Sequence, residues 1–229
     1  MNAVRLLGAR VIVFALSLLG ANSAGAATAL IDLRRIDAVV GDAAAGKAKA
    51  TACMGCHGPA GIAPVPMFPN LAGQKTEYLY WALVEFQRAA RTDSPMTAQV
   101  AHLGDADMRD LAAYFAALPA ASAAAVAAMP DARAAALFLR GDPARGVPPC
   151  QGCHGADAGG HPLAVDAARY RAYPMLRGQH APYLTQRLKD FRDGKLIDSS
   201  NDRIMRGVAR SLDDDSIDQL SSWLQAGAR

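Results

Sequence analysis

An internal repeat constrains the fold of this 229-residue chain more than any other feature of its sequence. Residues 68–74 (FPNLAGQ) recur 105 positions later as residues 173–179 (YPMLRGQ). The apolar residues beyond them keep the same offset, with Tyr78, Leu79, Leu83 and Phe86 matching Tyr183, Leu184, Leu188 and Phe191. Because blocks repeated at a fixed offset indicate copies of one structural unit, the sequence predicts two related domains.

The repeated blocks predict helices. Their apolar positions follow the i, i+1, i+4/5, i+8 spacing of an amphipathic helix. A later block aligns at an offset of 109, where Leu103, Met108, Leu111, Tyr114 and Phe115 match Leu212, Ile217, Leu220, Trp223 and Leu224. Acidic residues open this last helix in both halves: Asp105 and Asp107, then Asp213, Asp214 and Asp215. Such residues can cap free N–H groups and complement the helix dipole. Because no convincing strand pattern is present, the predicted fold class is all-α.

All four cysteines belong to two copies of a C-x-x-C-H motif, CMGCH at residues 53–57 and CQGCH at residues 150–154. Two thiols one helical turn apart can reach the two vinyl groups of one porphyrin, and the adjacent histidine then lies under the iron. The sequence therefore predicts two covalently bound haem c groups. Their predicted attachment residues are Cys53, Cys56, His57, Cys150, Cys153 and His154.

The cysteine pairs alone have other interpretations besides haem attachment. A single C-x-x-C pair is also typical of a thioredoxin-like redox site, half a zinc site or a structural disulfide. A zinc site built from both pairs would not need a histidine after each one. A redox pair normally opens a helix within a strand-helix-strand pattern, which this sequence lacks. Haem attachment is the interpretation that accounts for both histidines.

The N-terminus predicts export. Arg5 and Arg10 accompany a short apolar stretch at residues 11–19, and Ala24-Gly25-Ala26 offers the small residues of a cleavage site. We expect residues 1–26 to be a signal peptide and the mature protein to be periplasmic, where c-type haems are attached. The apolar stretch is short for a membrane span, although an uncleaved anchor stays open as an alternative.

The mature chain is nearly neutral. The full chain has 24 basic and 21 acidic residues, and loss of Arg5 and Arg10 leaves a net charge of +1. Four haem propionates would make the holoprotein slightly acidic. The overall charge therefore gives little support for an anionic partner. We predict no nucleic-acid partner, while peripheral association with a membrane stays open.

The remaining length suits two domains of about 100 residues each. We predict a first domain at residues 27–120, an alanine-rich linker at residues 121–133 and a second domain at residues 134–229. The stretch 134–140 is expected to begin the first helix of the second domain.

The repeat also selects a second axial ligand for each iron. Methionine in this role raises the reduction potential relative to histidine. Of eight methionines, only Met96 and Met205 occupy matching positions, in loop-like sequence just before the last helix of each domain. Although core packing is the commoner role of any one methionine, this matched pair favours the iron. The predicted iron ligands are His57 and Met96 in the first domain and His154 and Met205 in the second.

The other three histidines have no histidine at the matching position of the other half. His102 aligns with a serine and His180 with a lysine, while His161 lies in a longer loop of the second half. We therefore expect these residues to lie on the surface or to form hydrogen bonds, and a haem with two histidine ligands is disfavoured.

Two prolines have a predicted role beside the proximal histidines. Pro69 follows His57 by twelve residues, and in this the segment resembles small class I cytochromes c, in which a proline carbonyl at that spacing accepts the imidazole Nδ1–H. By the repeat, Pro174 should do the same for His154 across a gap of twenty residues. The alternative is that both prolines only shape their loops.

Longer motifs carry a family resemblance. They are CMGCHGPAG, MFPNLAGQ, SPM and DMRDLAAYF in the first half, and GVPPCQGCHG, YPMLRGQH, DFRDG and RIMRGVARSL in the second. With them the chain resembles cytochrome c4, a family of dihaem periplasmic electron carriers built from two class I cytochrome c domains. The resemblance covers nearly all of the mature chain. It implies the same four iron ligands and two domains that face each other across a pseudo-twofold interface.

One departure from the family pattern is the longer loop at residues 160–172, which contains Arg169 and Arg171. Three roles stay open as alternatives for this loop: contact with a propionate, with the other domain or with a redox partner. A solvated loop is the main expectation.

The resemblance implies electron transfer without bond chemistry at the protein, and we predict no catalytic residues. It places the carrier in a respiratory chain, between a quinol-oxidising complex and a terminal oxidase, with transient docking to each partner. Two alternatives are kept. A dihaem peroxidase would need an open distal site on one iron. A fixed cytochrome subunit of a membrane dehydrogenase or oxidase would retain an anchor or co-purify with its complex.

Overall fold

The computed structural model describes residues 29–88, 94–121 and 131–228. The first half contains α1 (Ala43–Lys49), α2 (Thr51–His57), α3 (Thr76–Gln87), α4 (Met96–Val100) and α5 (Asp105–Ala117). The second half contains α6 (Ala132–Arg140), α7 (Gln151–His154), α8 (Ala168–Arg171), α9 (Ala181–Arg192), α10 (Ser200–Ala209) and α11 (Asp214–Gln225). Three 3-10 helices are η1 (Leu33–Arg35), η2 (Pro143–Arg145) and η3 (Pro162–Ala164). Strand pairing within the described ranges is limited to two isolated bridges, and the all-α prediction is confirmed.

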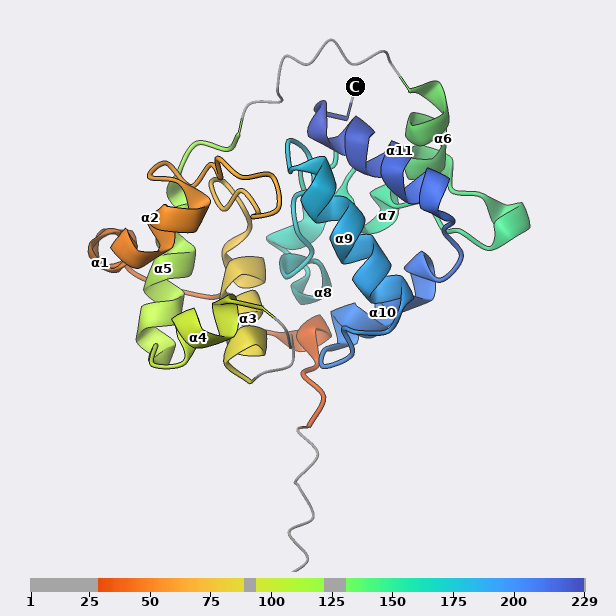
Figure 1. The fold of residues 1–229 in the computed structure, drawn as a ribbon. Helices are drawn as coiled ribbons and strands as arrows, with labels where there is room; N and C mark the ends of the chain where they lie inside the picture. The colour runs from red at the N-terminus through yellow and green to blue at the C-terminus, as the bar shows by residue number, and fades with distance from the viewer. Residues whose placement is uncertain (1–28, 89–93, 122–130, 229) are drawn as a thin grey trace, which may run out of the picture.

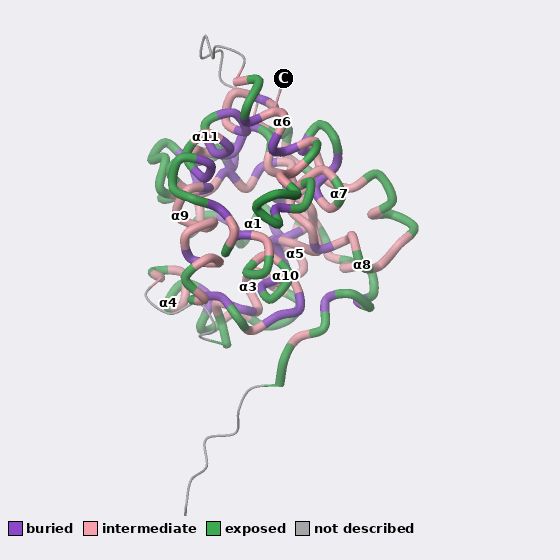
Figure 2. Tube along the Cα trace, turned by 90° about the vertical axis from the view of Figure 1, so that its right-hand side faces the viewer, coloured by how far each residue is buried: buried purple, intermediate pink, exposed green. Residues whose placement is uncertain are grey.

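Each half has its own apolar core, built on its last helix. In the first half α5 packs against α1 and α3, and in the second half α11 packs against α6 and α9. Figure 1 shows the two halves side by side, the first coloured orange to yellow-green and the second green to blue. The matched positions are buried in both halves: Met108, Leu111, Tyr114 and Phe115, then Ile217, Leu220, Trp223 and Leu224. In Figure 2 such buried positions alternate with exposed ones along the helices. The repeat therefore builds the same helical unit twice.

The acidic residues at the start of the last helix of each half act as expected. The Asp107 carboxylate accepts the Gly104 N–H at 3.0 Å at the start of α5. The Asp213 carboxylate accepts the Ser216 N–H at 2.8 Å at the start of α11. Both bonds satisfy an amide near a helix N-terminus, where a negative charge also complements the dipole.

The segments around the two selected methionines are helical, so the prediction of loops there was wrong. Met96 is the first residue of α4, and Met205 lies in the middle of α10. A capping box begins α10: the Ser199 hydroxyl accepts the Asp202 N–H at 3.2 Å, and the Asp202 carboxylate accepts the Ser199 N–H at 3.0 Å. This box supplies partners for amides that the helix itself leaves unpaired, which favours a helix over a loop.

Residues 29–36, here called the N-terminal strap, cross from the first half to the second (Figure 1). The Ile31 N–H donates to Asp198 O at 3.0 Å, and the Ser200 N–H donates to Ile31 O at 2.8 Å. Leu33 is 3% exposed and shares a small apolar cluster with Ile36, Ala172 and Trp81. The strap therefore covers the start of α10, although its sequence precedes the first domain's helices.

The longer loop at residues 160–172 is ordered by η3 and α8. The Arg171 guanidinium donates to Ile36 O at 3.1 Å, and Ala172 is only 2% exposed. The expectation of a solvated loop was therefore wrong for its C-terminal end, which contacts the strap. Leu163 and Val165 are exposed, so the middle of the loop does face solvent.

None of the described helices is long and apolar enough to cross a membrane. The predicted signal peptide at residues 1–26 and most of the predicted linker lie outside the described residues. The first helix of the second half begins at Ala132, close to the start expected at residue 134.

Candidate haem-binding sites

Each C-x-x-C-H motif lies on a short helix that ends at its histidine. Cys53 and Cys56 lie on α2, which ends at His57, while Cys150 precedes α7, which ends at His154. The two histidines are 4% and 5% exposed. Because the thiols of each pair lie about one turn apart on helical backbone, both motifs have the arrangement that the sequence predicted.

A glycine after each histidine allows the chain to turn sharply away. Gly58 has φ +76° and Gly155 has φ +79°, a backbone region that favours glycine. A Cβ at Gly58 would lie 2.0 Å from Ile62 O, and one at Gly155 would lie 2.3 Å from Gly160 O. Glycine is therefore the residue type that fits directly after the histidine of each motif.

The two proximal histidines are oriented by proline carbonyls. His57 Nδ1 lies 2.9 Å from Pro69 O, and His154 Nδ1 lies 2.9 Å from Pro174 O. Because a carbonyl can only accept, each Nδ1 carries the proton and each Nε2 has a free lone pair. The prediction that Pro174 would match Pro69 is confirmed, despite the longer gap in the second half.

The surroundings keep both imidazoles neutral. Burial lowers the pKa of His57 and of His154, and the bond to the proline carbonyl opposes this only in part. A neutral imidazole is the form that ligates iron. No described group forms a hydrogen bond with either Nε2, so both nitrogens are available for a metal.

All four thiols are free of disulfide bonds. Burial raises the pKa of Cys53 and Cys153, and raises that of Cys150 to about 11. The described residues contain no group of three or more His, Cys, Asp or Glu side chains placed to hold a metal ion, so a zinc site lacks ligands there. Two free thiols and a neutral histidine with a free Nε2 fit a covalently bound haem c in each half.

The two selected methionines occupy corresponding places. Met96 lies on α4, which packs against α3, and Met205 lies on α10, which packs against α9. Because α3 and α9 are the matched helices of the repeat, the methionines are related by the same internal symmetry. Both side chains are half-buried. Their assignment as iron ligands stays a prediction.

The other histidines behave as expected. His102 is exposed. His161 accepts the Leu163 N–H at 3.1 Å, and its ring stacks on Tyr170 with 3.6 Å between centroids. His180 Nε2 donates to Ala63 O at 3.0 Å across the two halves.

Two glutamines join the halves by reciprocal hydrogen bonds. The Gln179 side chain accepts the Asn70 N–H at 2.8 Å and donates to Asn70 O at 3.0 Å. The Gln74 side chain accepts the Met175 N–H at 2.8 Å and donates to Met175 O at 2.9 Å. Because Gln74 matches Gln179 and Asn70 matches Met175 in the repeat, these bonds follow a pseudo-twofold relation. Sequence reasoning did not identify this bridge, although each repeated block ends in the glutamine.

Fold and site together define a class, the c-type cytochromes with two haem-binding domains. A family model described as Cytochrome c matches residues 43–119 and again residues 135–228. A cytochrome c4 from Pseudomonas aeruginosa is 39% identical over 189 residues, which cover 81% of this chain and 88% of that protein. The chain belongs to the cytochrome c4 family.

Two further relatives extend the comparison. The crystal structure of reduced recombinant cytochrome c4 from Pseudomonas stutzeri superposes with a TM-score of 0.70 at 36% identity, covering 82% of this chain and 99% of that one. A thiosulfate dehydrogenase electron acceptor from Thiomonas intermedia is 34% identical, covering 80% of this chain and 82% of that protein. These similarities support two haem c groups in a dihaem electron carrier.

Proposed function

We propose that this chain is a periplasmic electron carrier in which His57 and Met96 ligate the first iron and His154 and Met205 ligate the second. The observation that carries the proposal is the matched pair of bonds from histidine Nδ1 to a proline carbonyl. Each bond leaves a neutral Nε2 free beside two unpaired thiols. The matched positions of the methionines on α4 and α10 support the second ligand of each iron.

The residues of the chain attach, bury and orient the cofactor. When bound, each haem supplies a one-electron iron couple. With a histidine and a methionine on each iron, neither metal would keep a position for substrate, and the protein would carry out no bond chemistry. The domain boundaries proposed above, 27–120 and 134–229, then give one haem to each half.

The family resemblance supports the partners that we propose. We place the carrier between a quinol-oxidising complex and a terminal oxidase, with export directed by residues 1–26. Docking to each partner is expected to be transient and to bury a small area, as is usual for redox encounters.

Potentiometric titration of the purified holoprotein with visible spectroscopy tests this function. We expect two low-spin haems per chain, each reduced by one electron, and almost no turnover of hydrogen peroxide. A single haem, or a high-spin haem that turns over peroxide, would contradict the proposal and favour a peroxidase.

A second candidate function is that of a dedicated electron acceptor for one dehydrogenase. The similarity to a thiosulfate dehydrogenase electron acceptor favours this alternative. Two measurements distinguish a mobile carrier from a fixed subunit. They are the intact mass of the mature protein and its elution with or without a membrane dehydrogenase during purification. Cleavage near Ala27 and elution as a free protein support a mobile carrier, whereas a retained anchor supports a fixed subunit.

A further inference from the structure

The glutamine bridge between the halves meets the proximal histidines at a single peptide group on each side. The Pro69–Asn70 peptide accepts the His57 Nδ1–H at its carbonyl and donates its N–H to Gln179. The Pro174–Met175 peptide accepts from His154 and donates to Gln74 in the same way. Each proximal histidine is therefore linked through one peptide to a glutamine of the other half.

Hydrogen bonds in such a chain strengthen one another. When a peptide N–H donates to an acceptor, electron density shifts toward its carbonyl oxygen, which becomes a better acceptor. A stronger bond to the Nδ1–H makes the imidazole a more basic ligand. A more basic ligand stabilises the oxidised iron, so each glutamine should lower the potential of the haem in the opposite half.

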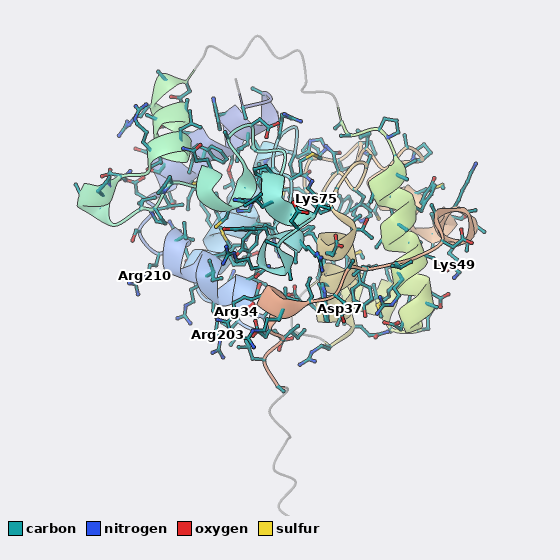
Figure 3. The ribbon with its side chains drawn as sticks, turned by 180° about the vertical axis from the view of Figure 1, so that it is seen from behind. Arg34, Asp37, Lys49, Lys75, Arg203 and Arg210 are labelled. Carbon is teal, nitrogen blue, oxygen red and sulfur yellow. The ribbon has the colours of Figure 1, made fainter. Side chains whose placement is uncertain are left out.

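The setting of these bonds favours such an effect. Gln74 is 4% exposed, and Gln179 and Asn70 are each 7% exposed. In a buried site of low dielectric, hydrogen bonds are electrostatically stronger than in water. Figure 3 shows Lys75, the neighbour of Gln74, at the border between the halves.

We propose that Gln179 tunes the first haem and Gln74 tunes the second, so that each domain sets part of the reduction potential of the other. The inference rests on the proposed function, because it takes His57 and His154 as axial ligands. In this arrangement both glutamines are positioning residues that act through a peptide and a histidine. A change in the contact between the domains would therefore change both potentials.

The crossed pattern of potentials tests the proposal. Gln179→Met removes the acceptor at similar side-chain size and should raise the potential of the first haem, leaving the second unchanged. Gln74→Met should raise only the second. Because the strengthening per bond is modest, about 10–30%, we expect a change of up to about twofold in the reduction equilibrium constant, which is about 18 mV for a one-electron couple. Met96→Ala and Met205→Ala variants identify which potential belongs to which haem.

His180→Ala is the matched control, since it removes an interdomain hydrogen bond to Ala63 that touches neither proline peptide. This variant should leave the reduction potentials of both haems unchanged. Equal shifts of both haems in either glutamine variant, or a shift confined to the haem of the substituted half, would overturn the proposal. Spectra that still show two low-spin haems would then leave the proposed function intact.

A different observation concerns the outer face of α10. Arg203, Arg206 and Arg210 are exposed, lie at i, i+3 and i+7 on one face, and form no ion pair with a described carboxylate. Figure 3 shows Arg203 and Arg210 extending away from the body of the protein. These arginines line one surface groove with Ile197, which is 52% exposed, and Ile204 beside them is 37% exposed. Three unpaired cations in a nearly neutral chain make this face locally basic.

The geometry points to this arginine face as the docking surface for an acidic partner protein that exchanges electrons with the second haem. Met205 lies on the opposite side of the same helix, so the partner would be separated from that ligand by about 10 Å, one helix diameter. Complementary charge steers such encounters and sets their rates. A membrane is disfavoured as occupant because membrane-binding helices expose a whole apolar face. Of the apolar residues of α10, Ala209 is buried, Met205 and Val208 are half-buried, and Ile204 alone is exposed.

Poly-L-glutamate is a suitable probe of the arginine face. On addition of this probe to the reduced holoprotein, we expect NMR shifts confined to residues around Ile197 and along α10. The triple variant Arg203→Gln/Arg206→Gln/Arg210→Gln should bind the probe about tenfold more weakly, because each lost exposed ion pair weakens binding by about twofold. The control Lys47→Gln/Arg133→Gln/Arg140→Gln changes the net charge equally at exposed positions on other helices. Equal losses in the two triple variants would overturn the proposal. So would arginine-dependent binding to phosphatidylglycerol vesicles without binding to poly-L-glutamate, which would indicate a membrane surface. The binding readout does not depend on the iron ligands.

Discussion

Substitution of Leu33 tests whether burial of one side chain holds the N-terminal strap on the second half. Leu33 is 3% exposed, although it lies in a segment only a few residues long. Its N–H also donates to the Ser200 hydroxyl at 3.0 Å, next to the start of α10. Leu-to-Ala changes in cores cost about 2–5 kcal/mol, and a site at the edge of the fold can partly collapse. We therefore expect Leu33→Ala to destabilise the closed strap by about 2–3 kcal/mol.

Amide hydrogen exchange of the reduced holoprotein measures this opening directly. The Ser200 N–H is bonded to Ile31 O, so it exchanges only when the strap lifts or the second half unfolds. A loss of about 2–3 kcal/mol corresponds to roughly 30- to 150-fold faster exchange at Ser200. Core amides, such as that of Leu220, should stay more protected than Ser200, because they do not become exposed when the strap alone lifts.

Leu30→Ala is the matched control, because Leu30 belongs to the same strap but is 40% exposed. It should change exchange at Ser200 by less than about threefold, since its side chain loses little burial. If exchange at Ser200 were equally fast in the two variants, or unchanged in Leu33→Ala, the assigned role of Leu33 would be wrong.

Two further predictions concern the attachment helix of the second half and the last helix of the first. Gly155→Ala should reduce holoprotein yield and lower the thermal unfolding temperature, because the new Cβ would lie 2.3 Å from Gly160 O. Gly152→Ala is the control and should be tolerated, because its Cβ would meet no atom within 4 Å. Hydrogen bonds from the Arg109 guanidinium and from a tyrosine hydroxyl lower the pKa of Asp105 below its usual value of 3.8. Ionised Asp105 therefore stabilises the folded state above that pH. This stabilisation is lost as the pH falls through the pKa of Asp105 in the folded state. Urea unfolding should therefore show Asp105→Asn less stable than wild type at neutral pH and equal to it in strong acid; an equal deficit at both would refute the assignment.

Local and repeated signals in the sequence predicted much of the fold. The apolar spacing around Tyr78 and its match in Tyr183 gave α3 and α9, and acidic residues gave the starts of α5 and α11. The bond to Pro69 was predictable because its spacing of twelve residues from His57 resembles that of small class I cytochromes c. The repeat then transferred this role to Pro174.

Contacts between distant segments were not predictable in the same way. The strap pairs residues 29–36 with residues 198–200, a partner that no local pattern specifies. The glutamine bridge depends on how two domains meet, and a single polar residue in each block does not define that geometry. The helix at Met205 was a different kind of omission, because the S-x-x-D capping signal from Ser199 is visible in the sequence.

The iron ligands are the central claim, and single and double substitution of the two methionines tests them most directly. In oxidised holoprotein, the sulfur-to-iron absorption band should lose one of two contributions in Met96→Ala and the other in Met205→Ala. The double variant should lack the band entirely, with both haems still attached to their cysteines. Undiminished absorption in either single variant would show that the substituted methionine does not ligate iron.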